Sequence, residues 1–279
     1  MEFAGAVTVE STPLARLLDG PRYEVIPVAG IEAKVQDLPE GSTVAVTASP
    51  AQGLERTIDV STVLAAGGYR AVPHFSARML TGRSELERLV RRLDGTGIDE
   101  AFVIGGDATP PAGVYADAGD LLEELAGMAH PFKRIGIGGY PEGHPLIADD
   151  LLLEALLRKQ PHATHIVTQL CFDTDALVSW VGAIREAGVD LPVLVGLPGV
   201  VERRKLAEIS LKSGVGASLR YLRKNRRQLA ALARSRRYDP TPLAGAVAAH
   251  LDDGLGLGGV HLFTFNQVAP TREWVASNS

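Results

Sequence analysis

Three polar side chains stand inside or directly after apolar runs of this 279-residue chain. Glu24 lies within "YEVIPV", Asp107 follows "VIGG" and Gln169 closes "HIVTQ". A carboxyl group in an apolar strand suits a general acid. A carboxylate beside glycines could bind a heterocycle or steady a cation. An amide that both donates and accepts hydrogen bonds matches the edge of a pterin or of an amide.

A second group of candidates surrounds "IGIGGYPEGHP" at residues 135–145. Two glycines leave room for a ligand against the backbone, and Tyr140 and His144 follow them. We interpret this stretch as the rim of a binding site, with Glu142 as part of the turn. His74 in "VPHFS" is a further candidate, although the histidines lack metal-ligand spacing with each other or with the single cysteine, Cys171.

Each of these residues also has a purely structural interpretation. Glu24 could occupy an edge position facing solvent, Asp107 could close an Asx turn before prolines, and His74 could be a hydrogen-bonding core residue. Only the positions of the residues in the fold can separate these alternatives.

Eight short apolar runs rich in β-branched residues recur along the chain and predict strands. Helical patterns separate most of them, which is typical of parallel strands with crossover helices. The predicted strands are 22–27, 43–48, 70–75, 100–106, 134–140, 165–170, 192–197 and 259–265. The predicted helices are 55–66, 84–94, 119–129, 149–159, 174–187 and 202–212, with two extra helices at about 216–235 and 241–251.

Eight strand–helix units over this length predict an α/β (β/α)8 TIM-type barrel with extra helices between strands 7 and 8. We expect a single domain over 1–279, with a barrel at about 22–268 and residues 1–21 as an N-terminal extension. An open doubly wound sheet is the alternative, but "EVIPVAG" lacks the glycine-rich phosphate turn of that fold. In a barrel the polar residues at the ends of the runs converge on one face, where active sites lie.

Composition narrows the function classes. The net charge of −5 argues against a general nucleic-acid-binding protein, and no apolar run is long enough to span a membrane. The lone Cys171 and the absence of a signal-peptide pattern predict a cytoplasmic protein without disulfides. The basic segment 203–237 either binds an anionic tail or forms a solvated helical face.

Taken in order, the segments resemble the methylenetetrahydrofolate reductase family from about residue 22 to 268. The matching stretches are "YEVIP", "VTASPAQGLERT", "VPHFSA", "IGGD", "VYADAGDLL", "GGYPEGHP", "VTQLCFD" and "HLFTFN". The resemblance implies a (β/α)8 barrel that reduces 5,10-methylenetetrahydrofolate to 5-methyltetrahydrofolate, with FAD as cofactor and NADH or NADPH as electron donor.

The resemblance also implies roles for individual residues. Glu24 corresponds to the general acid that opens the folate ring, Asp107 to a carboxylate near flavin and pterin, and Gln169 to a pterin-binding residue. The positions that would line the flavin site are Thr47, His74, Gly106, Asp107, Tyr115, Ala116, Gly138, Tyr140 and His144.

Several positions depart from the family pattern, among them the opening strand, which has "EVIPV" instead of a double proline. Gly105 and Gln267 replace arginines expected near FAD and folate, Ala48 replaces an aromatic residue, and a leucine or Arg158 stands where a lysine would meet the FAD phosphates. Because these replacements remove positively charged side chains that would contact a dinucleotide, they predict weak FAD binding or none.

Two other functions stay open. One is a folate- or flavin-binding paralogue, or a subunit that needs a partner protein for electron delivery. Whichever function holds, a homo-oligomer and a complex with a partner subunit are both open. The other, a barrel lyase or aldolase, is disfavoured because the eight runs contain no lysine for a Schiff base.

Overall fold

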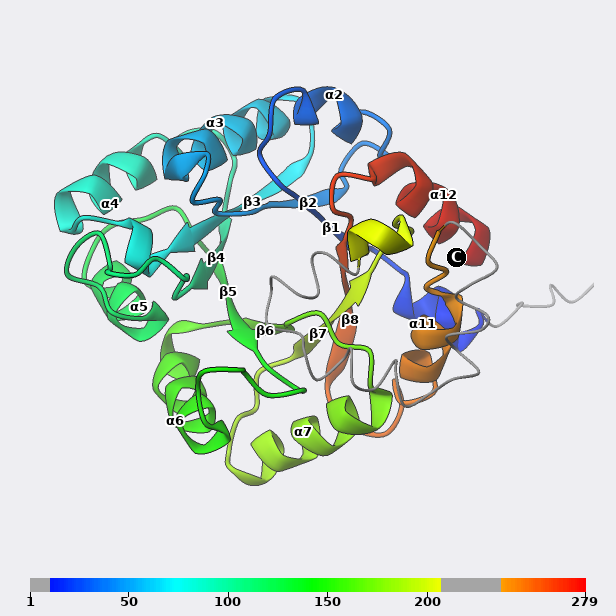
Figure 1. The fold of residues 1–279 in the computed structure, drawn as a ribbon. Coiled ribbons are helices and arrows are strands. Elements are labelled where there is room, and N and C mark those ends of the chain that lie inside the picture. Colours follow the sequence, from blue (N-terminus) through cyan, green and yellow to red (C-terminus); the bar gives the residue numbers. More distant parts are fainter. Residues whose placement is uncertain (1–10, 207–236) are drawn as a thin grey trace, which may run out of the picture.

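Eight parallel strands close into a barrel in the computed structural model, which describes residues 11–206 and 237–279 (Figure 1). Each strand pairs with its neighbours in chain order, and β8 pairs with β1. The strands are β1 (Arg22–Val25), β2 (Thr43–Val46), β3 (Arg70–Ser76), β4 (Glu100–Ile104), β5 (Arg134–Gly139), β6 (His165–Thr168), β7 (Val193–Pro198) and β8 (Leu257–Phe263). The predicted barrel is confirmed, and the open-sheet alternative is wrong.

Helices surround the barrel and follow the strands along the chain. They are α1 (Pro13–Leu17), α2 (Ile31–Val35), α3 (Gly53–Ala66), α4 (Arg83–Arg91), α5 (Ala118–Ala126), α6 (Asp149–Lys159), α7 (Thr174–Glu186), α11 (Thr241–Ala248) and α12 (Val268–Asn278), with 3₁₀ turns η1 (Ala77–Met79) and η2 (Gln160–His162). The sequence patterns predicted neither α1 nor α12. The predicted helix 216–235, and the part of helix 202–212 beyond residue 206, lie outside the described residues.

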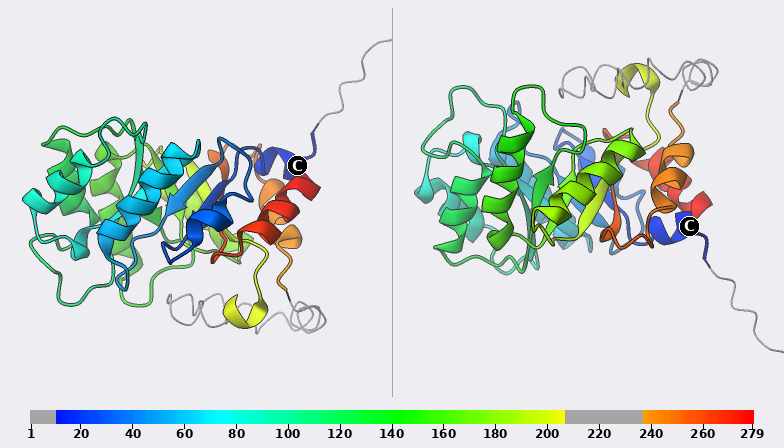
Figure 2. Two further views of the ribbon diagram at one scale, coloured as in Figure 1. Left: turned by 90° about the horizontal axis from the view of Figure 1, so that it is seen from above. Right: turned by 90° about the horizontal axis from the view of Figure 1, so that it is seen from below.

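Figure 2 shows α1, α11 and α12 together at one side of the barrel, beside the C-terminus. Contacts between α1 and α11, and between α12 and α2, hold this side together. Within the part of the chain that the structure describes, no helix has the length and apolar character needed to cross a membrane.

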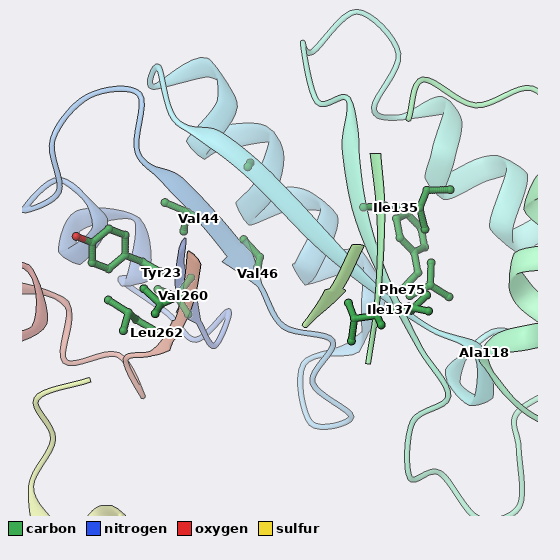
Figure 3. Packing of buried hydrophobic residues seen from close by; sticks show 14 of the residues in the cluster. Tyr23, Val44, Val46, Phe75, Ala118, Ile135, Ile137, Val260 and Leu262 are labelled. Carbon is green, nitrogen blue, oxygen red and sulfur yellow. The ribbon is translucent and has the colours of Figure 1, made fainter. Parts of the chain in front are cut away.

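Side chains alternate between two environments along each strand. Outward-facing residues pack beneath the helices and form the main hydrophobic core, as Figure 3 shows for Val44 and Val46 on β2 and for Val260 and Leu262 on β8. Burying one such side chain stabilises the fold by about 1.5–3 kcal/mol. The inward-facing residues are therefore free to be polar without weakening this core.

The inward-facing residues near the N-terminal ends of the strands form a buried ionic network. Glu100 on β4 forms an ion pair with Arg22 on β1, and both side chains are 9% exposed. Arg134 Nε lies 3.5 Å, and His165 Nε2 3.3 Å, from the same carboxylate. Glu100 thus connects β4 to β1, β5 and β6 across the barrel floor.

Aspartates begin the helices that follow the functional loops. The Asp117 carboxylate accepts hydrogen bonds from two backbone N–H groups at the start of α5, and Asp173 does the same for α7. Such caps satisfy N–H groups that have no partner within the helix. They fix where the loops after β4 and β6 end, and these loops carry Asp107 and Gln169.

Candidate active site

A cavity of about 400 Å³ opens at the C-terminal ends of the barrel strands. Side chains from strands far apart in sequence line it together. Six predicted site residues are among the lining residues, namely Glu24, Thr47, His74, Gly138, Tyr140 and Gln169. Four aromatic or imidazole residues that the sequence interpretation did not select also line it, namely Phe102, His261, Phe263 and Phe265.

The Glu24 carboxyl group lies next to two imidazoles. Its Oε2 is 3.0 Å from His261 Nε2 on the neighbouring strand and 4.0 Å from His74 Nε2. The Glu24 side chain is 14% exposed, whereas the two histidine side chains are 4% exposed or less. Glu24 therefore faces the cavity inside the barrel, and the solvent-facing edge interpretation is wrong.

His74 is held neutral by its surroundings. Burial lowers its pKa to about 4, which outweighs the opposite effect of the Glu24 carboxylate. Its ring packs against Phe102, with 4.7 Å between ring centroids. A neutral imidazole and an aromatic ring thus form part of the cavity wall beside the carboxyl group.

The end of β8 is strained where it borders the cavity. Phe265 and Asn266 have positive φ angles of 49° and 63°, an unusual conformation for a bulky residue such as phenylalanine. The Asn266 side chain accepts a hydrogen bond from Ile26 N (2.8 Å) and donates one to Ile26 O (3.0 Å). This clamp ties β8 to β1 and places the Phe263 and Phe265 rings, stacked at 6.3 Å, along the cavity.

Gln169 and Glu142 have different roles in the loops after β6 and β5. Gln169 lines the cavity while its Oε1 accepts a hydrogen bond from Leu170 N at 2.8 Å. Glu142 Oε1 accepts hydrogen bonds from Phe172 N (2.7 Å) and Asp173 N (3.0 Å). Glu142 therefore holds the β6–α7 loop against the β5–α6 loop, in agreement with a turn role.

Tyr140 links the cavity to Asp107 and His144, neither of which lines it directly. Burial and the nearby Asp107 carboxylate raise the pKa of the Tyr140 hydroxyl. The Tyr140 and His144 rings meet edge to face at 5.3 Å. Asp107 is exposed, so it lies on the rim rather than in the cavity.

The remaining predicted positions lie around the β4–α5 loop, away from the cavity. A side chain at Gly106 would place its Cβ only 2.0 Å from Ser76 Oγ, and φ there is +84°. Tyr115 is 3% exposed within the hydrophobic core, and Ala116 N donates to Asp120 Oδ2. The cavity therefore brings six of the predicted positions together, leaves Asp107 and His144 at its rim, and leaves Gly106, Tyr115 and Ala116 outside it.

A groove of about 710 Å³ between α6 and α7 adjoins the cavity and shares Gly138, Gly139 and Tyr140 with it. Lys159 lies along this groove and is only 9% exposed. Its Nζ donates to Gly138 O at 3.3 Å, and no carboxylate within the described residues forms an ion pair with it. Burial lowers the pKa of Lys159 to about 8.

Arg158, the adjacent residue, points to the other side of α6. Its guanidinium binds Asp117, Asp120 and Glu123 at 2.8–3.3 Å, so its charge is already matched. Lys159 is therefore the cation of this helix that is available to an anion. The same groove is also lined by the carboxylates of Glu142, Asp149, Asp150 and Asp173, so Lys159 is the lining residue that would meet the phosphates of a dinucleotide.

Metal and thiol chemistry have little support within residues 11–206 and 237–279. No group of three or more His, Cys, Asp or Glu side chains there could hold a metal ion. Cys171 is buried, and burial together with Glu142 raises the pKa of its thiol. A raised pKa suppresses the thiolate that nucleophilic catalysis requires.

The buried His74 should make the protein acid-sensitive. In the unfolded chain the imidazole binds a proton below about pH 6.5, whereas in the folded chain it does so only below about 4. The free energy of unfolding is therefore unaffected by His74 above pH 6.5. It falls by about 3 kcal/mol as the pH decreases to 4, because the unfolded chain gains a proton that the folded chain does not bind. Urea unfolding at several pH values should show a smaller loss for H74Q, whereas the partly exposed H250Q should match the parent protein.

A family model described as methylenetetrahydrofolate reductase matches residues 32–275. Methylenetetrahydrofolate reductase 2 of Saccharomyces cerevisiae is 32% identical over 93 residues, which cover 32% of this chain and 16% of that protein. Methylenetetrahydrofolate reductase (NADH) 1 of Arabidopsis thaliana is 24% identical over 208 residues, which cover 65% of this chain and 33% of that protein. The match thus spans a third or less of these relatives.

A solved structure shows the same fold at low sequence identity. It is an uncharacterized protein from Clostridium thermocellum that binds two copies of 5-methyl-5,6,7,8-tetrahydrofolic acid. The two chains are 12% identical and superpose with a TM-score of 0.62, over 94% of this chain and 98% of the other.

Proposed function

Because this chain belongs to the methylenetetrahydrofolate reductase family, we propose that it reduces 5,10-methylenetetrahydrofolate to 5-methyltetrahydrofolate by hydride transfer. The observation that carries this proposal is the Glu24 carboxyl group, which lines an aromatic-walled cavity and is hydrogen-bonded to His261 on one oxygen. An acid beside an aromatic-walled cavity suits a substrate that must be protonated before it accepts a hydride.

The chemistry assigns separate tasks to three side chains. Protonated Glu24 gives its proton to a bridging nitrogen of the folate, the C–N bond breaks, and an electrophilic iminium forms. Asp107, on the rim beside Tyr140, stabilises that positive charge as it develops. The Gln169 amide can donate to the pterin through Nε2 while Oε1 remains bonded to Leu170.

The hydride then adds to the methylene carbon and converts it to a methyl group. NADH or NADPH is the ultimate donor in this proposal and leaves as NAD(P)+. Bound FAD would supply the redox chemistry that carries the hydride from NAD(P)H to the folate. Lys159 would hold its phosphates and the open space at Gly138 would accept its flat ring, since a Cβ there would have no contact closer than 3.8 Å.

Lys159 provides a specific test of FAD binding. K159M should weaken FAD binding about 10-fold to 100-fold, because it removes a buried charge-assisted hydrogen bond to phosphate. FAD fluorescence quenching titrations of the purified protein measure this change. K133M is the matched control, since Lys133 is 79% exposed and pairs with Asp99. Equal affinities for K159M and K133M would show that FAD phosphates do not use Lys159.

Turnover tests the proposed reaction itself. Purified protein is incubated with methylenetetrahydrofolate and NADH or NADPH, with and without added FAD, and methyltetrahydrofolate is measured by mass spectrometry. We expect product with at least one donor. Folded protein that makes no product under any of these conditions rejects the proposal, and the visible spectrum shows whether flavin is retained.

A folate-binding subunit that receives electrons from a partner is the second candidate. Gly105 and Gln267 motivate it, because glycine and glutamine replace two cations of the family pattern. The structural relative that binds methyltetrahydrofolate is compatible with a binding role. Tight folate binding without turnover, followed by turnover when a reductase is added, would favour this candidate.

A further inference from the structure

We propose that His261 is a positioning residue for Glu24 and determines which carboxyl oxygen carries the proton delivered to the substrate. The expected effect on kcat rests on the proposed folate reduction, whereas the hydrogen bond between His261 and Glu24 does not. The sequence interpretation did not select His261, which occurs in the otherwise apolar run "GVHLFTF".

Barrel closure brings the two groups together. His261 on β8 is in register with Arg22 on β1, and Glu24 lies two residues after Arg22 on the same face of that strand. Glu24 and His261 therefore both face the barrel interior. The Nε2–Oε2 distance of 3.0 Å is that of a hydrogen bond, and the His261 side chain is 2% exposed. A buried imidazole at this distance has little freedom to move, and it limits the rotation of the carboxyl group in turn.

The contact makes the two carboxyl oxygens different. Oε2 is paired with His261, whereas no described residue hydrogen-bonds Oε1. If Nε2 of a neutral His261 carries hydrogen, it donates to Oε2, and a proton on the carboxyl group must then reside on Oε1. Because Glu24 lines the cavity, Oε1 is the oxygen left for the substrate.

The unpaired ring nitrogen supports this tautomer. His261 Nδ1 is buried and has no hydrogen-bond partner in the described part of the chain. A buried N–H without a partner costs more than a buried lone pair, so hydrogen on Nε2 is favoured over hydrogen on Nδ1. The neighbouring His74 Nε2, at 4.0 Å from Oε2, is too far away to take over the hydrogen bond.

Two substitutions separate positioning from simple packing. In H261Q the amide nitrogen can replace Nε2 as donor to Oε2, whereas H261L fills the space without a donor. We expect H261L to lower kcat about 10-fold to 100-fold with KM for folate changed less than about threefold, and H261Q to recover most of the loss. H250Q, at a partly exposed histidine, is the control.

Nitrogen-15 NMR of histidine-labelled protein tests the contact without requiring turnover. We expect the His261 ring, identified among the seven histidines by the signals missing in H261Q, to be neutral with hydrogen on Nε2, and E24L to shift these signals. Hydrogen on Nδ1, or signals unchanged in E24L, overturns the proposal. So does an equal loss of kcat in H261Q and H261L, while absent turnover in the parent protein counts against the proposed function alone.

Discussion

Replacing Glu24 with glutamine should lower kcat for methylenetetrahydrofolate reduction by about 100-fold to 10,000-fold. Glutamine keeps the size of the side chain and can still pair with His261, but its amide has no acidic proton to give to the folate. Steady-state kinetics with the donor that supports turnover measure the loss.

Binding measurements separate a chemical defect from a structural one. The E24Q protein should bind folate within about threefold of the parent affinity, because the other lining residues are unchanged. E154Q is the matched control, since Glu154 is an exposed glutamate of α6 and should leave kcat unchanged. Parent-level turnover in E24Q would remove Glu24 from the role of acid.

Replacing Glu100 with leucine should lower the free energy of unfolding by about 3–5 kcal/mol. The substitution leaves the Arg22 guanidinium, 9% exposed, without its carboxylate on the barrel floor. Arg134 loses the same partner, and His165 loses a neighbour at 3.3 Å. Urea unfolding at neutral pH measures the change.

A double substitution identifies the unpaired charge as the cause. R22M/E100L removes both members of the pair and should recover part of the loss, because no buried charge is left without a partner. E55Q, at an exposed glutamate of α3 that binds two arginines, should change stability by less than about 1 kcal/mol. If the double variant is no more stable than E100L, lost packing rather than the unpaired Arg22 charge causes the destabilisation.

Much of the fold could be predicted because its signals are local. Each strand is a short apolar run, and each crossover helix has its own periodicity, so the order of elements follows from neighbouring residues. The terminal helices α1 and α12 escaped prediction. Their buried residues, such as Leu17 and Trp274, pack against parts of the chain far away in sequence.

Only part of the candidate site could be predicted, because local sequence signals give the position of a residue along the chain but not its contacts. Glu24, His74, Tyr140 and Gln169 stand at strand ends, which converge in any barrel. The motif around Tyr115 predicts a site residue, but its side chain packs into the hydrophobic core. A motif locates a residue along the chain, but it does not determine the direction of its side chain.

By itself, the sequence determined the types and order of the elements, and hence the face of the barrel at which the polar strand ends meet. Only the tertiary structure decided which side chains touch. Glu24 and His261 are 237 positions apart and become neighbours because β8 closes onto β1. Arg158 and Lys159 are adjacent, but about 100° of rotation along a helix sends one to the acids of α5 and the other into the groove.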